Sequence, residues 1–339
     1  MANQALMARY LAAVESEMRS LLQPPTPALH DLYGYLCYHL GWADQNLQPA
    51  NEQSGKRLRP LFCLLCCKAC SGDWQRALPA AAAVELVHNF SLIHDDIEDS
   101  DTTRRGRPTA WTLWGIPQTL NAGDALYALS QLALLRLEKA GLPAEAVVDA
   151  ARLLNETSLR LTEGQFLDIR FESCAQVNVE EYLAMIERKT AALLAASCEL
   201  GALVAQAPPP QRHALRAFGL HLGLAFQIQD DILGIWGDPA VTGKPVGSDL
   251  IRRKKSLPIL HGLAHSEALR TLLASPALAP ADVERATREL EAVGSRQFCQ
   301  ERAEEHTAQA LAALDAASLR GDAAVTLRDL ALSLLGRER

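Results

Sequence analysis

Two acidic clusters, each following a long apolar segment, most constrain what this chain can fold into. His94-Asp95-Asp96-Ile97-Glu98-Asp99 follows the apolar run 80–93, and Asp230-Asp231 follows the largely apolar run 215–228. On a helix, Asp95 and Asp99 lie one turn apart on the same face, so their carboxylates converge. Both clusters are therefore predicted to lie at the ends of buried helices, at the mouth of an apolar core.

Carboxylates that converge keep their charge only when cations join them. Ligands that are all oxygen atoms favour Mg²⁺, which retains waters and binds substrate phosphates. Arg104 and Arg105 follow the first cluster and are suited to hold phosphate oxygens through forked hydrogen bonds. Taken alone, the acidic residues 95, 96 and 99 are also compatible with a solvated helix face, an alternative that stays open here. The whole pattern favours a polyanion bound by metal and arginine.

The composition predicts an all-α fold. Ala and Leu dominate the 339 residues, aromatic residues make up only 5%, and no alternating Val- or Ile-rich runs bounded by turn residues occur. A chain of this length with 49% hydrophobic residues can bury one large core, and we expect a single domain over residues 1–339. The net charge of -7 argues against nucleic acid as a partner.

No targeting or membrane-spanning segment is predicted. Residues 1–10 lack a basic region followed by a clean apolar stretch, so we expect a cytoplasmic protein. The most apolar run, Thr190 to Ala207, is interrupted by Glu199 and is followed by three prolines. We therefore expect a buried core helix there, in a protein that is not an integral membrane protein.

Five motifs give the chain its resemblance to a known family. From Gly55 to Pro258 it resembles the trans-type isoprenyl diphosphate synthases, also called polyprenyl synthases. In chain order the motifs are Gly55-Lys56-Arg57-Leu58-Arg59-Pro60, His94-Asp95-Asp96 through Arg104-Arg105-Gly106, Gly164-Gln165 with Asp168 and then Lys189-Thr190, Phe226-Gln227 with Asp230-Asp231, and Gly243-Lys244 with Gly247, Asp249 and Lys254.

The resemblance implies an isoprenoid-synthase helical bundle around a deep central apolar cavity. It implies a prenyltransferase that joins isopentenyl diphosphate head to tail with allylic diphosphates (dimethylallyl, geranyl and farnesyl). The allylic carbon–oxygen bond breaks, so positive charge develops on carbon while diphosphate departs as an anion. Stabilising that anion is then the main task of the enzyme.

The same resemblance assigns roles to residues. Three Mg²⁺ ions would bridge the allylic diphosphate, two on Asp95 and Asp99 and one on Asp230, with Asp96 and Asp231 in support. Fixed positive charge would come from Arg104, Lys189 and Lys254. Isopentenyl diphosphate would be gripped without metal by Lys56, Arg59, His88 and Arg105. Thr190, Gln227 and Lys244 complete the expected substrate-binding set.

One position departs from the family pattern. The second acidic motif often has a third aspartate three residues after the pair, and here Gly234 stands there. Because the third metal is expected to depend mainly on Asp230, we expect activity to survive. The glycine at 234 therefore affects mainly the set of ligands around the third metal ion.

Product length is expected to depend on the residues before Asp95. Phe90 lies five positions before it and the small Ser91 four, one helical turn or about 5.4 Å away. A ring at 90 would act as a floor, while Ser91 leaves room for a further isoprene unit. By resemblance, this pairing suggests geranylgeranyl diphosphate as the product, with farnesyl diphosphate as the alternative.

Other functional classes remain open on the sequence. A class I terpene cyclase shares the fold and the first acidic motif but needs no second diphosphate site, and a noncatalytic partner subunit tends to lose its aspartates. The family's usual assembly is a homodimer, which is what the resemblance implies here.

A stripe of cysteines could suggest a metal centre instead. Cys63, Cys66, Cys67 and Cys70 are spaced to line one side of a helix. One straight helix cannot wrap four thiolates tetrahedrally round an ion, and structural zinc sites take their ligands from turns. We therefore expect these cysteines to be buried small hydrophobic residues that bind no metal.

Overall fold

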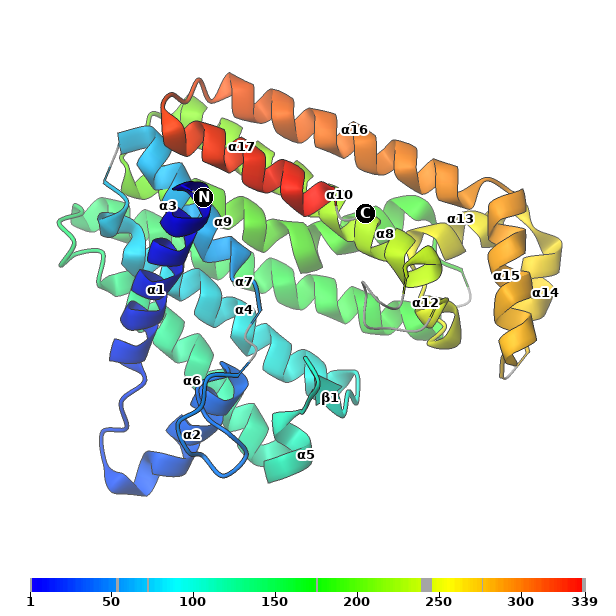
Figure 1. Cartoon of the computed structure of the whole chain (residues 1–339), viewed down its shortest axis with the longest axis horizontal. Coiled ribbons are helices and arrows are strands. Elements are labelled where there is room, and N and C mark those ends of the chain that lie inside the picture. The colour runs from blue at the N-terminus through cyan, green and yellow to red at the C-terminus, as the bar shows by residue number, and fades with distance from the viewer. Residues whose placement is uncertain are drawn as a thin grey trace. The chain divides into compact units, whose positions relative to one another are not determined.

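The computed structural model describes residues 2–52, 55–71, 73–174, 176–238, 246–275 and 277–336 (Figure 1). Within these ranges the chain is helical except for loops and one two-stranded sheet. The predicted all-α class is therefore confirmed.

The chain divides into two compact units. The first contains residues 1–158, 196–212 and 319–326, and the second contains residues 159–195, 213–318 and 327–339. Four of the five boundaries fall inside helices, namely α7 (Ala144–Ser173), α9 (Ala192–Val204), α10 (Pro209–Trp236) and α17 (Asp322–Leu335), so each of these helices has residues in both units.

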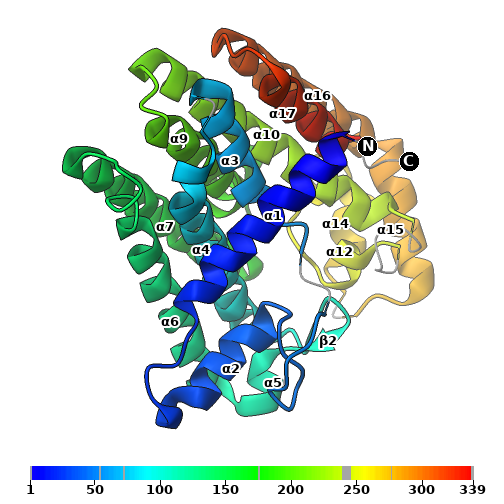
Figure 2. The ribbon, with the colours of Figure 1, turned by 60° about the vertical axis from the view of Figure 1, so that its left-hand side comes forward.

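Helix α4 (Leu78–Glu98) lies at the centre of the first unit. It packs against α1 (Ala2–Leu21), α3 (Leu58–Ser71) and α6 (Ile116–Leu135), as the two ribbon views show (Figures 1 and 2). The alanines at 80–83 are fully buried, and their small side chains allow neighbouring helices to approach closely. The other elements of this unit are η1 (Pro27–Leu29), α2 (His30–His39), η2 (Gln75–Ala77), α5 (Ala110–Trp114) and the first half of α7 (Ala144–Ser173).

The cysteine stripe lies on α3. Cys63, Cys66 and Cys67 have no exposed surface, as expected of small core residues. Gly201 of α9 (Ala192–Val204) packs directly against them, since a Cβ at that position would lie 2.2 Å from the backbone oxygen of Cys63. Burial raises the pKa of the Cys66 thiol well above its ordinary value, so this sulfur stays protonated at neutral pH.

Cys66→Ala is therefore expected to act through packing alone. Removing a buried sulfur should lower the free energy of unfolding by roughly 1–2 kcal/mol, from lost burial and the small cavity left behind. Denaturant unfolding measures this loss, and elemental analysis of the purified native protein should find no stoichiometric zinc or iron. Bound metal that disappears in the variant would contradict the packing role.

A short hairpin follows α4. Strands β1 (Thr103–Arg104) and β2 (Arg107–Pro108) pair antiparallel, with Arg105 (φ 54°) and Gly106 (φ 76°) as the two turn residues. Positive φ at both central positions is the geometry that matches the twist of a two-residue hairpin, and glycine adopts it without strain. The turn fixes the directions of the two consecutive arginines.

The second unit has its own core. Tyr182 and Ile186 of α8 (Val179–Ile186) pack with Leu224 and Ile228 of α10 (Pro209–Trp236) and with Leu257. A π-helical turn, η3 (Glu187–Ala191), joins α8 to α9. The remaining helices are α12 (Ser248–Ile251), α13 (Leu257–His265), α14 (Glu267–Leu273), α15 (Pro280–Ala292), α16 (Ser295–Ala316) and part of α17 (Asp322–Leu335).

Candidate functional site

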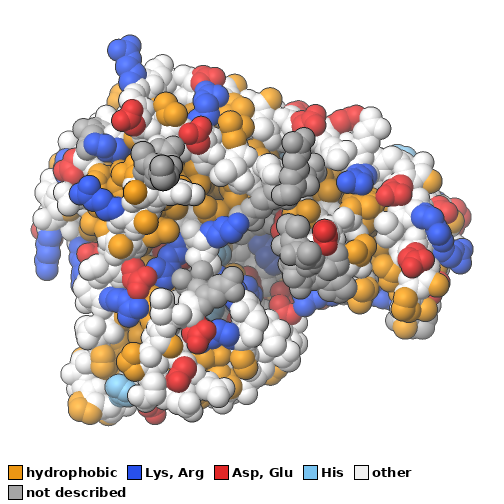
Figure 3. All heavy atoms as spheres, in the orientation of Figure 1, with side chains coloured by type: hydrophobic (Ala, Val, Ile, Leu, Met, Phe, Trp, Pro, Cys, Tyr) orange, Lys and Arg blue, Asp and Glu red, His pale blue; other side chains and the backbone are white. Residues whose placement is uncertain are grey.

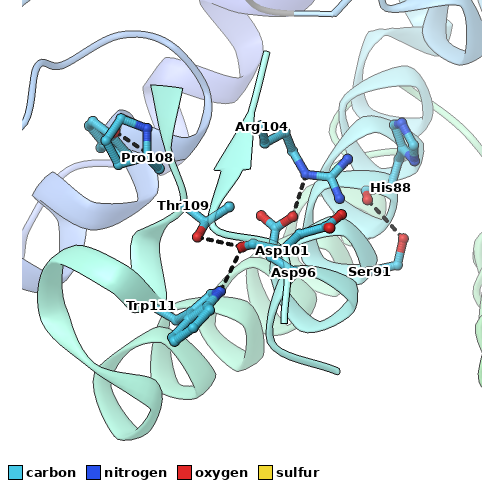
Figure 4. A network of polar contacts seen from close by, with 9 residues as sticks. His88, Ser91, Asp96, Asp101, Arg104, Pro108, Thr109 and Trp111 are labelled. Carbon is cyan, nitrogen blue, oxygen red and sulfur yellow. Dashed lines mark hydrogen bonds and ion pairs between the residues drawn. The ribbon is translucent and has the colours of Figure 1, made fainter. Parts of the chain in front are cut away.

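The first acidic motif closes α4. The Asp99 N–H donates to the Asp95 carbonyl over 2.8 Å, so these two residues lie one helical turn apart, as predicted. Asp99 is exposed and Asp95 half-buried, whereas Asp96 is only 2% exposed. Burial raises the pKa of Asp96 to about 6, and the neighbouring Arg104 charge opposes that rise. Asp96 accepts a hydrogen bond from Nε of Arg104 at 2.6 Å (Figure 4).

The segment after the motif is anchored by one carbonyl. The backbone oxygen of Asp101 accepts hydrogen bonds from Oγ1 of Thr109 and Nε1 of Trp111, both at 2.8 Å (Figure 4). The Asp101 N–H in turn donates to the Asp96 carbonyl over 3.0 Å. These bonds tie the hairpin and the start of α5 to the end of α4, and so hold Arg104 beside the acidic motif.

Residues from two predicted motifs, together with His88 of α4, form a cationic group of the first unit. Nη1 of Arg59 lies 3.2 Å from Nε2 of His88. Burial, followed by the Arg59 charge, holds the pKa of His88 well below its usual value, so a neutral imidazole accepts from the guanidinium. The Arg105 side chain lies against Gly55, where a Cβ would approach Nη2 to 2.6 Å. Lys56 beside it is exposed.

Glu85 is a residue of this group that the sequence analysis missed. It is only 4% exposed, and its Oε1 accepts from Nδ2 of Asn89 at 3.1 Å. Burial raises the pKa of Glu85, while the charges of Arg57, Arg59 and Arg105 oppose the rise. The three arginine charges favour the ionised form of Glu85, so its carboxylate is suited to act as a counter-charge to them. The only sequence signal was an acid inside the apolar run 80–93.

The two residues expected to set product length lie on α4. The Phe90 ring packs against Tyr127 of α6, with 5.2 Å between ring centroids, and against His94 at 5.0 Å. Oγ of Ser91 donates to the His88 carbonyl at 2.9 Å (Figure 4). Ser91 lies on the face of α4 that bears Asp95, and Phe90 is rotated away from that face towards α6.

The second acidic motif lies within α10, which continues beyond it to Trp236. Asp230 is exposed, whereas Asp231 is buried and fully engaged with protein partners. Its Oδ2 accepts from the Tyr182 hydroxyl at 2.5 Å and from the Leu257 N–H at 3.2 Å, and its Oδ1 accepts from Nε2 of Gln227 at 3.1 Å. Burial raises the pKa of Asp231 to about 7, which the hydrogen bonds from Tyr182 and Gln227 oppose. Its partners favour a supporting role for Asp231.

Gln227 extends this network to the π-helical turn. Oγ1 of Thr190 donates to Oε1 of Gln227 at 2.9 Å, and Nζ of the adjacent Lys189 lies 2.5 Å from Oδ2 of Asp168. Gly164 of α7 allows this approach, because a Cβ there would lie 2.4 Å from the Lys189 backbone nitrogen. The structure thus brings together Lys189, Thr190, Gln227 and Asp231 in the second unit.

The last predicted motif is only partly described. Lys254 is exposed, and its backbone N–H donates to the Asp249 carbonyl over 2.9 Å. Lys244, with Gly243 before it, lies outside the described residues.

The chemistry of the acidic residues fits Mg²⁺. Asp95, Asp99 and Asp230 offer carboxylate oxygens at or near the surface, and Mg²⁺ usually takes one or two carboxylates together with waters and substrate phosphates. Over the described ranges, no group of three or more His, Cys, Asp or Glu side chains is close enough to hold an ion by itself. Each of these carboxylates is therefore suited to an ion that keeps waters or phosphate oxygens as its other ligands.

The helices and the surface show two further features. In the part of the chain that the structure describes, no helix is both long enough and apolar enough to cross a membrane. On the face shown in Figure 3, basic and acidic side chains are interspersed with hydrophobic ones.

Comparisons with known proteins agree with this geometry. The family model described as polyprenyl synthetase matches residues 41–290. A (2E,6E)-farnesyl diphosphate synthase of Mycobacterium tuberculosis is 43% identical over 309 residues, covering 89% of this chain and 85% of the relative. A geranylgeranyl diphosphate synthase of the same organism is 47% identical over 283 residues, covering 82% of this chain and 79% of the relative.

A solved structure extends the likeness to the fold. The crystal structure of a polyprenyl synthetase from Streptomyces coelicolor A3(2) superposes with a TM-score of 0.89 at 36% identity, covering 98% of this chain and 99% of that one. The predicted isoprenoid-synthase helical fold is confirmed by this likeness.

Proposed function

Because this chain belongs to the polyprenyl synthetase family and is a prenyltransferase, we propose that it condenses isopentenyl diphosphate head to tail with allylic diphosphates. The product is a short-chain all-trans prenyl diphosphate, geranylgeranyl diphosphate in the first place and farnesyl diphosphate as the alternative. Residues 1–339 act as one polyprenyl synthase domain.

The observation that carries this proposal is the cationic group of the first unit. Arg59 and Arg105 come from two separate motifs and His88 from α4, and the charges of Arg59 and Arg105 act on the buried carboxyl of Glu85. A half-buried group with this excess of positive charge suits a diphosphate held without metal. A terpene cyclase has no second diphosphate substrate, so this group favours a synthase.

The chain's own residues have separable tasks in the reaction. Arg104, aimed by its bond to Asp96, and Lys189, held by Asp168, supply positive charge where the allylic diphosphate departs. Lys254 adds a further exposed cation. Lys56 assists the cationic group in orienting isopentenyl diphosphate, whose double bond attacks the allylic cation. The new cation then loses a proton to the released diphosphate. Thr190 and Gln227 are hydrogen-bonded to each other, and this bond holds their polar groups in place beside the substrate.

Asp95, Asp99 and Asp230 are the residues that would hold Mg²⁺, with Asp96 and Asp231 in support. When bound, three such ions would neutralise the departing diphosphate and lower the barrier to carbon–oxygen cleavage.

The deciding experiment uses the purified chain alone. Incubated with Mg²⁺, isopentenyl diphosphate and each allylic diphosphate in turn, it should consume both substrates, and chromatography of the dephosphorylated alcohols gives product length. Products confined to cyclised hydrocarbons would favour a terpene cyclase. No consumption of isopentenyl diphosphate would favour a noncatalytic subunit.

Product length gives a prediction about α4. Phe90→Ala should lengthen the products, because it removes the ring that packs against Tyr127. Ser91→Phe should shorten them towards farnesyl diphosphate, because it places a ring on the face of α4 below Asp95. The measurement is the distribution of alcohols at equal substrate conversion. An unchanged distribution in both variants would place the floor of the cavity elsewhere.

A homodimer and a cytoplasmic location complete the proposal. Helices α6 and α7 expose large apolar side chains, among them Leu132 (55%), Leu159 (61%) and Phe166 (62%), and such faces commonly pack against a second copy. Light scattering gives the mass in solution. All eight cysteines are free thiols, which suits a reducing compartment.

A further inference from the structure

A carboxylate of α1 joins two arginines, one of which belongs to the basic motif at residues 55–60. Oε2 of Glu15 accepts from Nη1 of Arg57 at 2.8 Å, and Oε1 of Glu15 accepts from Nε of Arg19 at 2.9 Å. Partial burial opposes the ionisation of Glu15, but the hydrogen bonds and charges of Arg57 and Arg19 outweigh it and lower the pKa of Glu15. The carboxylate is therefore a full counter-charge at neutral pH.

The guanidinium of Arg57 is enclosed by protein. The residue is only 8% exposed, and its Nη2 has no hydrogen-bond partner among the residues that the structure describes. Its Cζ lies 5.5 Å from the centroid of the Trp42 ring, and Cζ of Arg19 lies over the same ring at 4.1 Å. Removing the partner of a buried charge is strongly unfavourable, so Glu15 fixes where the side chain of Arg57 lies.

The backbone of Arg57 makes a turn that depends on this anchor. Its φ of 47° is left-handed, a conformation that a residue other than glycine keeps only where its surroundings hold it. The turn leads from the exposed Lys56 directly into α3, where Nη1 of Arg59 lies 3.2 Å from Nε2 of His88. The position of Arg57 therefore sets the directions of the two cations on either side of it.

The loop before the basic motif is tied to the same cluster. The Ala50 N–H donates to the Trp42 carbonyl over 2.9 Å, and the Glu52 N–H donates to the Gly41 carbonyl over 2.8 Å. Trp42 itself is only 4% exposed. The segment that leads into the motif is thus held at the residue over which the Arg57 guanidinium lies.

We propose that Glu15 is a positioning residue for the diphosphate of isopentenyl diphosphate: by holding Arg57, it fixes the turn that presents Lys56 and Arg59. This inference rests on the proposed function and adds to its site a residue of α1 that lies outside every motif. The charge of Arg57 already acts on Glu85. Without the Glu15 carboxylate, Arg57 is expected to turn towards Glu85 and to compete there with Arg59.

Glu15→Gln tests the proposal in the purified full-length protein, because it keeps the size of the side chain and removes its charge. The KM for isopentenyl diphosphate should rise roughly 10-fold, the order that one charge-assisted hydrogen bond contributes. Other residues hold the allylic diphosphate, so its KM and kcat should stay within about 2-fold of native values. Amide hydrogen exchange over residues 55–60, followed by mass spectrometry, should become faster.

Glu17→Gln is the matched control. Glu17 lies on the same helix and accepts from Nη1 of Arg136 at 2.9 Å, so its loss breaks a comparable ion pair away from the basic motif. Both KM values and the exchange of residues 55–60 should remain native. Glu15→Asp keeps the charge with a shorter reach and should show an intermediate rise in the KM for isopentenyl diphosphate alone. Circular dichroism and thermal melting identify variants that fail to fold, and Glu15→Asp carries the test if Glu15→Gln is one of them.

A native KM for isopentenyl diphosphate in folded Glu15→Gln would overturn the inference. An equal rise in the KM values of both substrates would overturn it as well, because it would indicate a general loosening of the fold. A native protein that does not condense the substrates would instead refute the proposed function. The exchange measurement would then decide on Glu15 alone: faster exchange of residues 55–60 in Glu15→Gln than in Glu17→Gln supports the positioning role, and equal exchange contradicts it.

Discussion

Asp95→Ala is expected to lower turnover at least about 10²-fold, the scale for removing one stabiliser of a developing anion. The side chain lies one turn from Asp99 at the end of α4 and is only half-buried, so its loss should leave the helix and the melting temperature nearly unchanged. Steady-state rates at saturating Mg²⁺ and substrates measure the effect.

The second motif offers a parallel variant and α4 a control. Asp230→Ala should cause a loss of similar size, because this exposed carboxylate is the one residue of the pair that the protein does not enclose. Glu98→Gln, on the last turn of α4, should keep a rate close to the native one. A near-native rate in Asp95→Ala would show that its carboxylate is not a metal ligand.

Gly164→Ala is expected to have the largest effect on stability among the single substitutions considered. The added Cβ would lie 2.4 Å from the Lys189 nitrogen and 2.7 Å from its Cα, and these backbone atoms cannot rotate away. Helix α7 and the π-helical turn must then separate, at a cost of about 1–3 kcal/mol in unfolding free energy. The separation also moves Nζ of Lys189 from its position 2.5 Å from Asp168, so turnover should fall too.

Denaturant unfolding and steady-state turnover, measured on the same preparation, test both parts. Arg160→Ala, at an exposed position of the same helix, is the control and should change the free energy of unfolding by less than about 0.5 kcal/mol. If Gly164→Ala matched this control in stability, the close contact between α7 and the turn would not exist in solution.

Local features of the site were predictable because helical periodicity is local. The spacing of Asp95 and Asp99 placed them one turn apart, and the structure confirms it. The cysteine stripe was likewise predicted to be a core face, and α3 buries three of its four cysteines completely. In both cases the residues whose spacing supports the prediction lie within about two turns of one helix.

Features that depend on segments distant in the sequence were not predictable. Asp230 and Asp231 look alike in the sequence, yet Tyr182 and the Leu257 N–H enclose only the second of them. The counter-charge role of Glu85 depends on arginines 57, 59 and 105, which three-dimensional packing brings to it. The short hairpin at 103–108 is held by its turn and was not predicted from an all-helical pattern.

The π-helical turn Glu187–Ala191 changes how the helix around it should be compared with related sequences. A π turn accommodates one residue more than an α turn, so it rotates the faces of α9 by about 100° relative to those of α8. A helical wheel drawn continuously from 179 to 204 therefore assigns wrong neighbours to half of its residues. An alignment with a one-residue gap in this turn would still match α8 and α9 to helices of the related sequence. It would nevertheless remove the π-helical turn that positions Lys189 and Thr190. A gap placed in this turn therefore changes the positions assigned to two substrate-binding residues, and a sequence similarity score does not detect that change.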